Sequence, residues 1–380
     1  MIYVDNNATT PLDESVLKKM LPYFSVNYGN AASNHKFGVE ANEAVNKARG
    51  EIAKLINAKN REIIFTSGAT ESINLALKGC AEHQDYKGHI ITLSTEHHAV
   101  LDTCKYLEER GVEVTYLEVM EDGLVNLPVL KEAFKRDTFL VCIMLVNNET
   151  GVIQPLKKIA DIAHQRGALL MTDATQAIGK IPVDVNDLGI DTLAFSGHKF
   201  YGPKGIGGLF IRSRGIYKAR INPILHGGGH ERNLRSGTLN VPLIVGLGEA
   251  CQIASSNMMK YKEQIEGLRN TFEKKLLKIG GISINGSIEY RLYNTSNVCF
   301  KGVNADAILI ELEEIMASTG SACTSMHIEP SHVLLAMGLS EDDAYSSIRF
   351  SFGKYNTMEE VKVLVNRVSK TFSKLKAFTF

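Results

Sequence analysis

Short apolar runs alternate with helix-like segments through much of this chain, and this alternation constrains the fold more than any other feature of the sequence. Seven runs have the length and apolar content of strands: EIIFT (62–66), HIITL (89–93), VEVTYL (112–117), FLVCIMLV (139–146), ALLMTD (168–173), DTLAFS (191–196) and GGLFI (207–211). Segments between them, such as SINLALKGCAEH and PLKKIADIAHQRG, place apolar residues at helical spacing. This alternation predicts an α/β fold whose mostly parallel, seven-stranded sheet is flanked by helices on both faces.

The pattern changes in the last third of the chain. A long helical stretch runs from about Pro242 to Ile279, and a smaller α+β pattern follows it. We therefore expect a large α/β domain over residues 15–256. A small α+β C-terminal domain would cover residues 257–380 and would include the N-terminal segment 1–14.

Charge and hydropathy argue against several classes of protein. The 380 residues are 44% hydrophobic, enough for a sizeable core. Lysine plus arginine equal aspartate plus glutamate at 42 each, so no excess of positive charge indicates a nucleic-acid partner. No apolar stretch approaches the roughly 18 residues that span a bilayer, and the first residues, MIYVDNNATTPLDE, lack the regions of a signal peptide. We expect a cytoplasmic protein that binds neither membrane nor nucleic acid.

The six cysteines show no spacing typical of a zinc site or a disulfide framework. Five lie in helix-like or strand-like stretches, where a thiol packs as a small apolar group: Cys80, Cys104, Cys142, Cys251 and Cys299. Cys323 differs, because it lies in ASTGSACTS, a run of small and hydroxyl residues that predicts a loop. His226, His230 and Glu231 lack the HExxH spacing of zinc hydrolases, so no metal site is predicted.

Polar side chains follow several of the predicted strands. In open α/β sheets, ligands bind where the carboxyl ends of strands and their loops gather. The segments at these ends are SGATES, STEHHAV, NNETG, ATQ and SGHK. They supply hydroxyls, amides, imidazoles and one lysine, a mixture that suits a small phosphorylated aromatic cofactor better than a dinucleotide or a metal.

Three of these segments contain the parts of a pyridoxal phosphate site. SGATES opens a helix whose free amides attract a phosphate, and Gly68 lets the backbone approach closely. Asp173 suits a protonated ring nitrogen, and Lys199 suits an imine with an aldehyde. Taken singly, a lysine is more often a surface charge and an aspartate after a strand more often a helix cap.

Eight stretches, in fixed order, resemble one known family. They are DNNATTP, FTSGATES, TEHHAVLDT, VNNETGVIQP, TDATQAIGK, SGHKFYGPKGIGG, HGGGHERNLRSGTLN and TGSACTS. They are similar to the signature stretches of the NifS/IscS-type cysteine desulfurases, which are fold-type I pyridoxal phosphate enzymes. The similarity runs from Tyr3 to about Gly353, nearly the whole chain.

The resemblance implies which residues hold the cofactor. Lys199 would form the covalent link and move the substrate proton, whereas Lys204 lacks the flanking hydroxyl and imidazole. Ser196, His198 and Thr70 would bind the phosphate. The full implied cofactor set is Ala69, Thr70, His97, Asn148, Asp173, Gln176, Ser196, His198, Lys199 and Thr238.

Within that set the resemblance gives each residue a role. His97, counted as catalytic with Lys199, would stack on the pyridine ring, and Asp173 would pair with its nitrogen. Gln176 would contact the phenolic oxygen. Asn148 would hold the ring or the substrate. Thr238 would reach the phosphate of the other subunit, which implies a homodimer.

Two further residues complete the chemistry that the resemblance implies. Arg349, in SSIRFSF, matches the arginine that binds the substrate carboxylate, a task that suits a guanidinium fork. Cys323 would attack the sulfur of L-cysteine and retain it as a persulfide, so that alanine is released. An acceptor protein would then take the sulfur for iron–sulfur cluster assembly, tRNA thiolation or cofactor synthesis.

Alternatives within the same fold stay open at this point. A selenocysteine lyase would share nearly every site residue, and an aminotransferase would share Lys199 and Asp173 without needing Cys323. A sulfur-carrier or assembly subunit without catalytic activity would not need all three of these residues.

Overall fold

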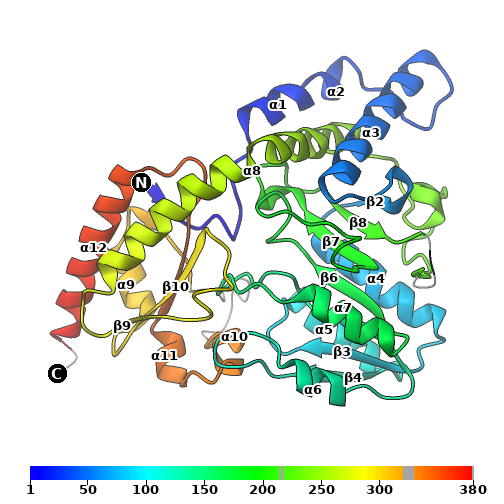
Figure 1. The fold of residues 1–380 in the computed structure, drawn as a ribbon. Helices are drawn as coiled ribbons and strands as arrows, with labels where there is room; N and C mark the ends of the chain where they lie inside the picture. Colours follow the sequence, from blue (N-terminus) through cyan, green and yellow to red (C-terminus); the bar gives the residue numbers. More distant parts are fainter. Residues whose placement is uncertain (214, 216–217, 320–328, 379–380) are drawn as a thin grey trace.

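In a computed structural model, which describes residues 1–213, 215, 218–319 and 329–378, the chain forms a large and a small sheet joined by a long helix (Figure 1). The large sheet has seven strands in the order β2-β8-β7-β6-β5-β3-β4. In chain order they are β2 (Ile63–Thr66), β3 (His89–Leu93), β4 (Glu113–Leu117), β5 (Thr138–Cys142), β6 (Leu169–Asp173), β7 (Thr192–Ser196) and β8 (Gly207–Ile211). All seven predicted strands are present, and they follow one another along the chain as predicted.

The direction of the strands places their polar ends at one edge. Neighbouring strands from β4 through β7 pair in parallel, whereas β8 runs antiparallel to both β7 and β2. Strand β2 therefore points the same way as β7. The carboxyl ends of β2, β3, β5, β6 and β7 consequently lie at the same edge, as the sequence predicted.

Helices cover both faces of the large sheet, because alternate strand residues point to opposite sides. Ile64, Ile90 and Leu140 belong to the apolar core cluster that includes residues of helices α4 and α5. Their neighbours Phe65, Ile91 and Val141 belong to the cluster that includes residues of α3, α7 and α8. The helices of the chain before α8 are α1 (Glu14–Met20), α2 (Pro22–Ser25), α3 (Lys36–Leu55), α4 (Ala69–His83), α5 (His98–Glu108), α6 (Leu127–Glu132) and α7 (Leu156–Gln165).

Strand β5 is shorter than the sequence predicted. The run 139–146 was expected to be one strand, but β5 ends at Cys142. Beyond that point the Met144 N–H donates to Glu96 Oε1 at 2.7 Å instead of to a neighbouring strand. The chain stays extended beside β6, since the Leu145 N–H donates to the Asp173 carbonyl at 2.9 Å.

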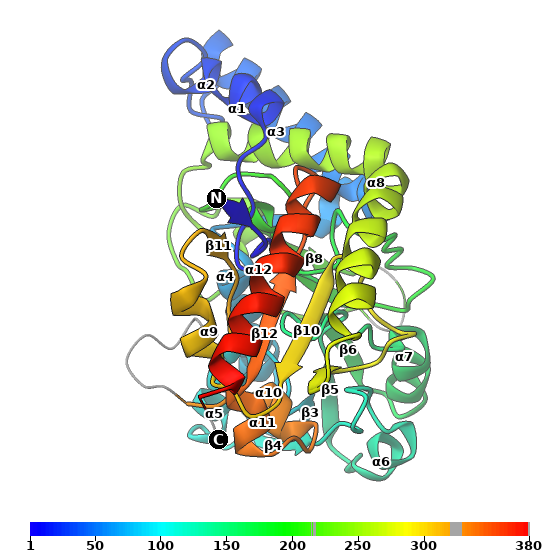
Figure 2. The same cartoon turned by 90° about the vertical axis from the view of Figure 1, so that its left-hand side faces the viewer.

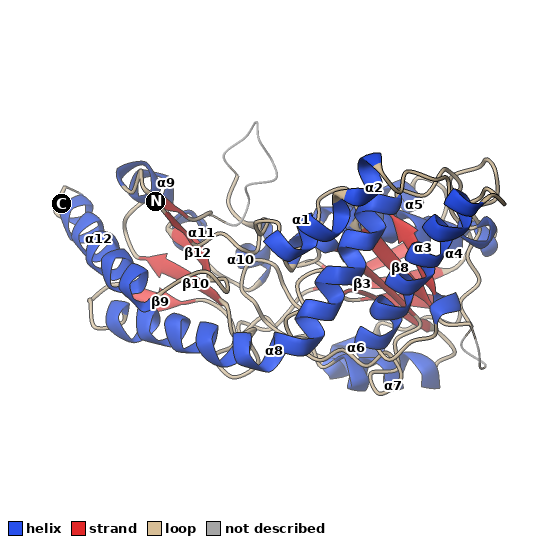
Figure 3. Ribbon diagram, turned by 90° about the horizontal axis from the view of Figure 1, so that it is seen from above, coloured by secondary structure: helices blue, strands red, loops and turns tan. Residues whose placement is uncertain are grey.

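Helix α8 (Val241–Leu276) connects the two sheets and runs unbroken through the predicted domain boundary at residues 256 and 257 (Figure 3). Its first part packs on α1 and α3, and its second part packs on α12 and β10. Neither α8 nor any other described helix is long and apolar enough to cross a membrane.

The small sheet has the order β12-β10-β9, and its strands pair antiparallel (Figure 2). Residues Ile2 and Tyr3 form β1, which pairs in parallel with β11, so the N-terminal segment joins this part of the chain. The division into domains at 15–256 and 257–380 stays a prediction. The remaining elements are β9 (Ile282–Ile284), β10 (Thr295–Phe300), α9 (Ala305–Glu311), β11 (Ile315–Met316), α10 (His332–Ala336), α11 (Glu341–Tyr345), β12 (Ser347–Ser351) and α12 (Met358–Lys376).

Candidate functional site

A cavity of about 570 Å³ opens at the carboxyl edge of the large sheet. Ten of the predicted site residues line it: Ala69, Thr70, His97, Asn148, Asp173, Gln176, Ser196, His198, Lys199 and Arg349. They come from the ends of five strands and from β12 of the small sheet. Thr238 does not line this cavity and is exposed in the loop before α8.

Lys199 lies in a 3-10 turn (Gly197–Lys199) directly after β7, and this turn directs its side chain into the cavity. Its Nζ donates to the backbone carbonyls of Asn7 at 2.7 Å and Ala8 at 2.8 Å. Lys204 also lines the cavity but is exposed. The geometry thus favours Lys199 as the anchored amine and Lys204 as a solvent-facing one.

The first turn of α4 forms one wall of the cavity. Gly68 is its N-cap and gives no side-chain cap to the amides that follow, so these N–H groups face the cavity with Ala69 and Thr70. A free helix N-terminus with its dipole attracts an anion such as phosphate. The backbone of β8 approaches this turn closely at Gly207. A Cβ at position 207 would lie 2.7 Å from the Cα of Gly68, so glycine is needed there.

Burial lowers the pKa of two histidines that line the cavity. Burial lowers the pKa of the His198 imidazole to about 4, and the cations of Lys199, Lys204 and Lys180 act in the same direction. Its Nδ1 lies 3.0 Å from Thr9 Oγ1. Burial also lowers the pKa of the His97 imidazole, against the opposing effect of the Asp173 carboxylate. A neutral ring of this kind suits stacking, and both rings can gain a proton when an anion binds.

Asp173 and Gln176 lie on the segment that follows β6. Asp173 is the last residue of the strand, is buried, and accepts a hydrogen bond from the Thr175 amide at 2.9 Å. Thr175 also lines the cavity, and its buried hydroxyl has no hydrogen-bond partner among the described atoms. Gln176 Nε2 donates to the Asn7 carbonyl at 2.9 Å.

Arg349 enters the cavity from β12 and joins the small sheet to the site. Its Nη1 donates to the Asn148 carbonyl at 3.0 Å, and its Nη2 pairs with Asp5 Oδ1 at 2.8 Å. The guanidinium is buried, and its Nε has no hydrogen-bond partner among the described residues. Arg349 lines the cavity, and its two hydrogen bonds use only two of the five guanidinium N–H groups.

Sequence reasoning missed the part played by the N-terminal segment. Asn7 contributes a carbonyl that both Lys199 and Gln176 use, and its side chain donates to Thr295 Oγ1 at 2.9 Å. The stretch DNNATTP was one of the eight signature stretches, but no site residue was predicted within it. Glu96 was missed as well: it is fully buried, and burial raises the pKa of its carboxyl well above the usual range.

The predicted sulfur acceptor, Cys323, lies outside the described residues. The chain on either side of residues 320–328 is attached to the rim of the cavity. Before the gap, Ser318 pairs with Arg349 through backbone hydrogen bonds of 3.3 and 2.7 Å. After it, Ser331 Oγ donates to Glu149 Oε2 at 2.5 Å, and His332 Nε2 lies 3.0 Å from the Glu96 carbonyl.

The other five cysteines are buried, as the sequence predicted. Burial raises the pKa of the Cys80 and Cys104 thiols to about 12 and that of Cys299 to about 11. It also raises the pKa values of the Cys142 and Cys251 thiols. A thiol with such a pKa is protonated at neutral pH and is a poor nucleophile.

Comparison with known proteins identifies the family. The chain matches the aminotransferase class-V family over residues 2–364. It is 47% identical over 378 residues to the cysteine desulfurase IscS of Rickettsia akari (strain Hartford), which covers 99% of this chain and 92% of that protein. The corresponding enzyme of Histophilus somni (strain 129Pt) is 48% identical over 379 residues, covering 99% of this chain and 93% of the relative.

A solved structure of a NifS-like protein superposes with a TM-score of 0.91 at 41% identity, covering 98% of this chain and 100% of that one. The chain therefore belongs to the class-V aminotransferase family, whose members depend on pyridoxal phosphate. Within that family it is a cysteine desulfurase of the NifS/IscS type. The fold class and the enzyme activity expected from the sequence are confirmed.

The residues at the cavity fit pyridoxal phosphate. The uncapped α4 N-terminus supplies amide donors for a phosphate. Lys199 supplies an amine for the aldehyde, and the buried Asp173 supplies a carboxylate for the ring nitrogen. The donor set therefore matches each polar part of the cofactor.

Proposed function

We propose that this cysteine desulfurase holds pyridoxal phosphate in the cavity, covalently linked to Lys199. The observation that supports this best is that Lys199 and Asp173, at the ends of the neighbouring strands β7 and β6, share one cavity with a free helix N-terminus. Ser196, His198 and Thr70 would hold the phosphate with the amides of Ala69 and its neighbours. Bound pyridoxal phosphate supplies an electron sink that weakens bonds at the substrate carbon next to nitrogen.

The residues of this chain would then position L-cysteine and move its protons. Arg349 would bind the substrate carboxylate, and Asn148 would flank it. The Nζ of Lys199 would take the α-proton of the bound substrate and later return a proton to carbon. His97 would cover the ring and keep it in place.

Sulfur removal would need a thiolate, and we propose Cys323 for it. Its Sγ would form a bond to the substrate sulfur while the carbon–sulfur bond breaks, with the electron pair going to carbon. Protonation of that carbon gives alanine, and Cys323 keeps the sulfur as a persulfide. The protonated state of the five buried cysteines supports Cys323 for this step.

The cofactor assignment is tested by reducing the yellow protein with borohydride and mapping the labelled peptide. We expect the label on Lys199, with Lys204→Met unchanged and Lys199→Ala unlabelled. A label on Lys204, or none on the wild type, would contradict the proposal.

We also propose a homodimer with shared active sites. Thr238 is exposed and does not line the cavity of its own chain. This position fits a contact with the phosphate that the partner subunit would bind. Sedimentation at micromolar concentration should show a dimer. Mixing inactive Lys199→Ala with inactive Thr238→Ala chains should restore part of the activity, because one site of the mixed dimer is intact.

The persulfide would pass to an acceptor protein, either an iron–sulfur scaffold or another sulfur carrier. The attachment of both flanks of residues 320–328 to the cavity rim supports delivery from this side of the molecule. Radiolabelled sulfur from L-cysteine should move from the wild type to a purified scaffold protein. No transfer to any acceptor, despite a labelled enzyme, would contradict this role.

A further inference from the structure

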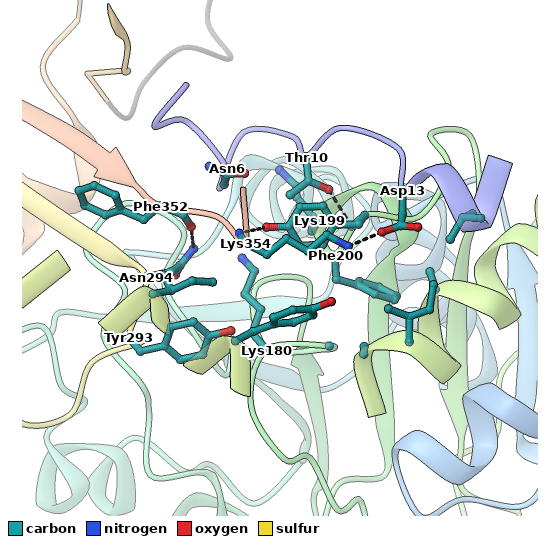
Figure 4. Close-up of a pocket in the computed structure, with 18 residues that line it drawn as sticks. Asn6, Thr10, Asp13, Lys180, Lys199, Phe200, Tyr293, Asn294, Phe352 and Lys354 are labelled. Atoms are coloured by element: carbon teal, nitrogen blue, oxygen red, sulfur yellow. Dashed lines mark hydrogen bonds and ion pairs between the residues drawn. The ribbon is translucent and has the colours of Figure 1, made fainter. Parts of the chain in front are cut away.

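Lys180 is a buried lysine beside the cavity that none of the roles above uses. It follows Gln176 by four residues in a turn after β6, so both side chains extend to the same side. Its Nζ donates to Gln176 Oε1 at 2.7 Å and to Asn7 Oδ1 at 3.3 Å. Figure 4 shows Lys180 and Lys199 at a small cavity of about 20 Å³, with Asn6 and Thr10 of the N-terminal segment above them.

These contacts leave the Gln176 amide one orientation. Its Nε2 faces the Asn7 backbone carbonyl, which can only accept, and its Oε1 faces the Lys180 Nζ, which donates. If the amide were flipped, its oxygen would face the Asn7 carbonyl, which is also an acceptor. Its nitrogen would then face the Lys180 Nζ, which is also a donor. Because one Nε2 hydrogen is used by Asn7, the second remains for the cavity that Gln176 lines.

The Asn7 side chain is itself fixed, so that its Oδ1 stays directed at the Lys180 Nζ. Asn294 Nδ2 donates to Asn7 Oδ1 at 3.1 Å. Asn7 Nδ2 donates in turn to Thr295 Oγ1 at 2.9 Å. The orientation of Gln176 is therefore determined by a network that extends into the small sheet.

The burial of Lys180 is costly and is not offset by an acidic partner among the described ion pairs. The charged groups that act on it are the cations Lys199 and Arg349, and burial with these neighbours lowers the pKa of its ammonium. Lys354, at the same small cavity, differs because it pairs with Asp13 and lies over the Tyr201 ring at 4.3 Å. A purely structural lysine would be expected to resemble Lys354.

We propose that Lys180 is a positioning residue that fixes the Gln176 amide with its N–H toward the phenolic oxygen of bound pyridoxal phosphate. The inference rests on the proposed cofactor site. An N–H directed at the phenolic oxygen withdraws negative charge from it. A less negative oxygen stabilises the protonated form of the Lys199-linked nitrogen less, so the pKa of that nitrogen falls. The visible absorbance of the holoenzyme therefore titrates at lower pH.

The test is a pH titration of the visible band in Lys180→Met, with Lys180→Ala as the second variant should the first not fold. Either should raise the titration midpoint by about one pH unit, because the hydrogen bond that orients the Gln176 amide is lost. Lys180→Gln keeps a donor and should stay near the wild-type midpoint. Lys354→Met is the matched control, since it removes a buried lysine that contacts Asp13 instead of Gln176, and its midpoint should not move.

An unshifted midpoint in both Lys180→Met and Lys180→Ala would overturn the inference. So would an equal shift in Lys180→Gln, because the effect would then come from charge alone. If the wild type shows no lysine-linked band at all, the proposed cofactor site fails instead, and the two failures are thus distinguishable.

Discussion

Arg349 Nη2 lies 2.8 Å from Asp5 Oδ1, which joins the last strand of the small sheet to the segment that follows β1. Asp5 fixes one edge of the guanidinium, and the Asn148 carbonyl accepts from the other terminal nitrogen. These two hydrogen bonds use two of the five guanidinium N–H groups of a residue that lines the cavity. The Asp5 pair thus orients Arg349 before any substrate carboxylate arrives.

Replacing Arg349 with methionine should lower kcat/KM for L-cysteine by about 100-fold or more, because charge-assisted hydrogen bonds to a carboxylate are lost. Steady-state kinetics with L-cysteine and with cysteamine, which lacks the carboxylate, checks this. The variant should lose the preference for L-cysteine while its rate with cysteamine changes little. A retained preference would show that another group binds the carboxylate.

Cys323→Ser should abolish sulfide and alanine production from L-cysteine, by several orders of magnitude, because the sulfur acceptor is missing. Mass spectrometry of the wild type after brief exposure to L-cysteine should place the added sulfur on the peptide that holds Cys323. Cys104→Ser is the control, since that thiol is buried in α5 and its pKa is raised to about 12. Persulfide on any other cysteine would refute this mechanism.

His198 should make the cofactor-free protein less stable in acid. Its folded-state pKa of about 4 lies below the ordinary 6.5, so the unfolded chain binds the proton more readily. Stability is therefore lost as the pH falls from about 6.5 toward about 4 and is unaffected above that window. His198→Gln should reduce the loss between pH 7 and pH 5 by about 1 kcal/mol, after allowance for solvent screening. Urea unfolding at both pH values measures it, and equal losses in the two proteins would contradict the assignment.

Breaking the buried pair of Arg49 and Glu231 should be strongly destabilising. Two hydrogen bonds of 2.7 and 2.6 Å join the side chains, and Glu231 also accepts from the Phe65 amide at 2.8 Å. Glu231→Gln should lower the free energy of unfolding by about 3 kcal/mol, because Arg49 is left buried without its counter-charge. Urea unfolding measures this loss, with Glu14→Gln as the control variant.

Glu14 forms an exposed pair with Lys18, so breaking that pair should cost less than about 1 kcal/mol. A similar small loss in Glu231→Gln would show that the buried pair adds no net stability.

The sequence alone was enough to predict the large sheet and most of the site. Apolar runs at strand length and helical spacing report local burial, so the seven strands and α8 could be predicted within a few residues. In a mostly parallel sheet, carboxyl ends meet at one edge, and this places Asp173, Ser196 and Lys199 together without knowledge of the coordinates.

Only the tertiary structure decided which distant groups complete the site. Asn7 lies 192 residues from Lys199 and accepts its hydrogen bond, and Lys180 donates to both Gln176 and the same asparagine. The end of β5 depended likewise on Glu96, whose carboxylate accepts a hydrogen bond from the amide of Met144, 48 residues further along the chain. Periodicity records which face of an element is buried, whereas hydrogen-bond partners depend on how elements far apart in the chain approach each other. That approach is set by the order of the strands and the packing of the two sheets, which no local pattern contains.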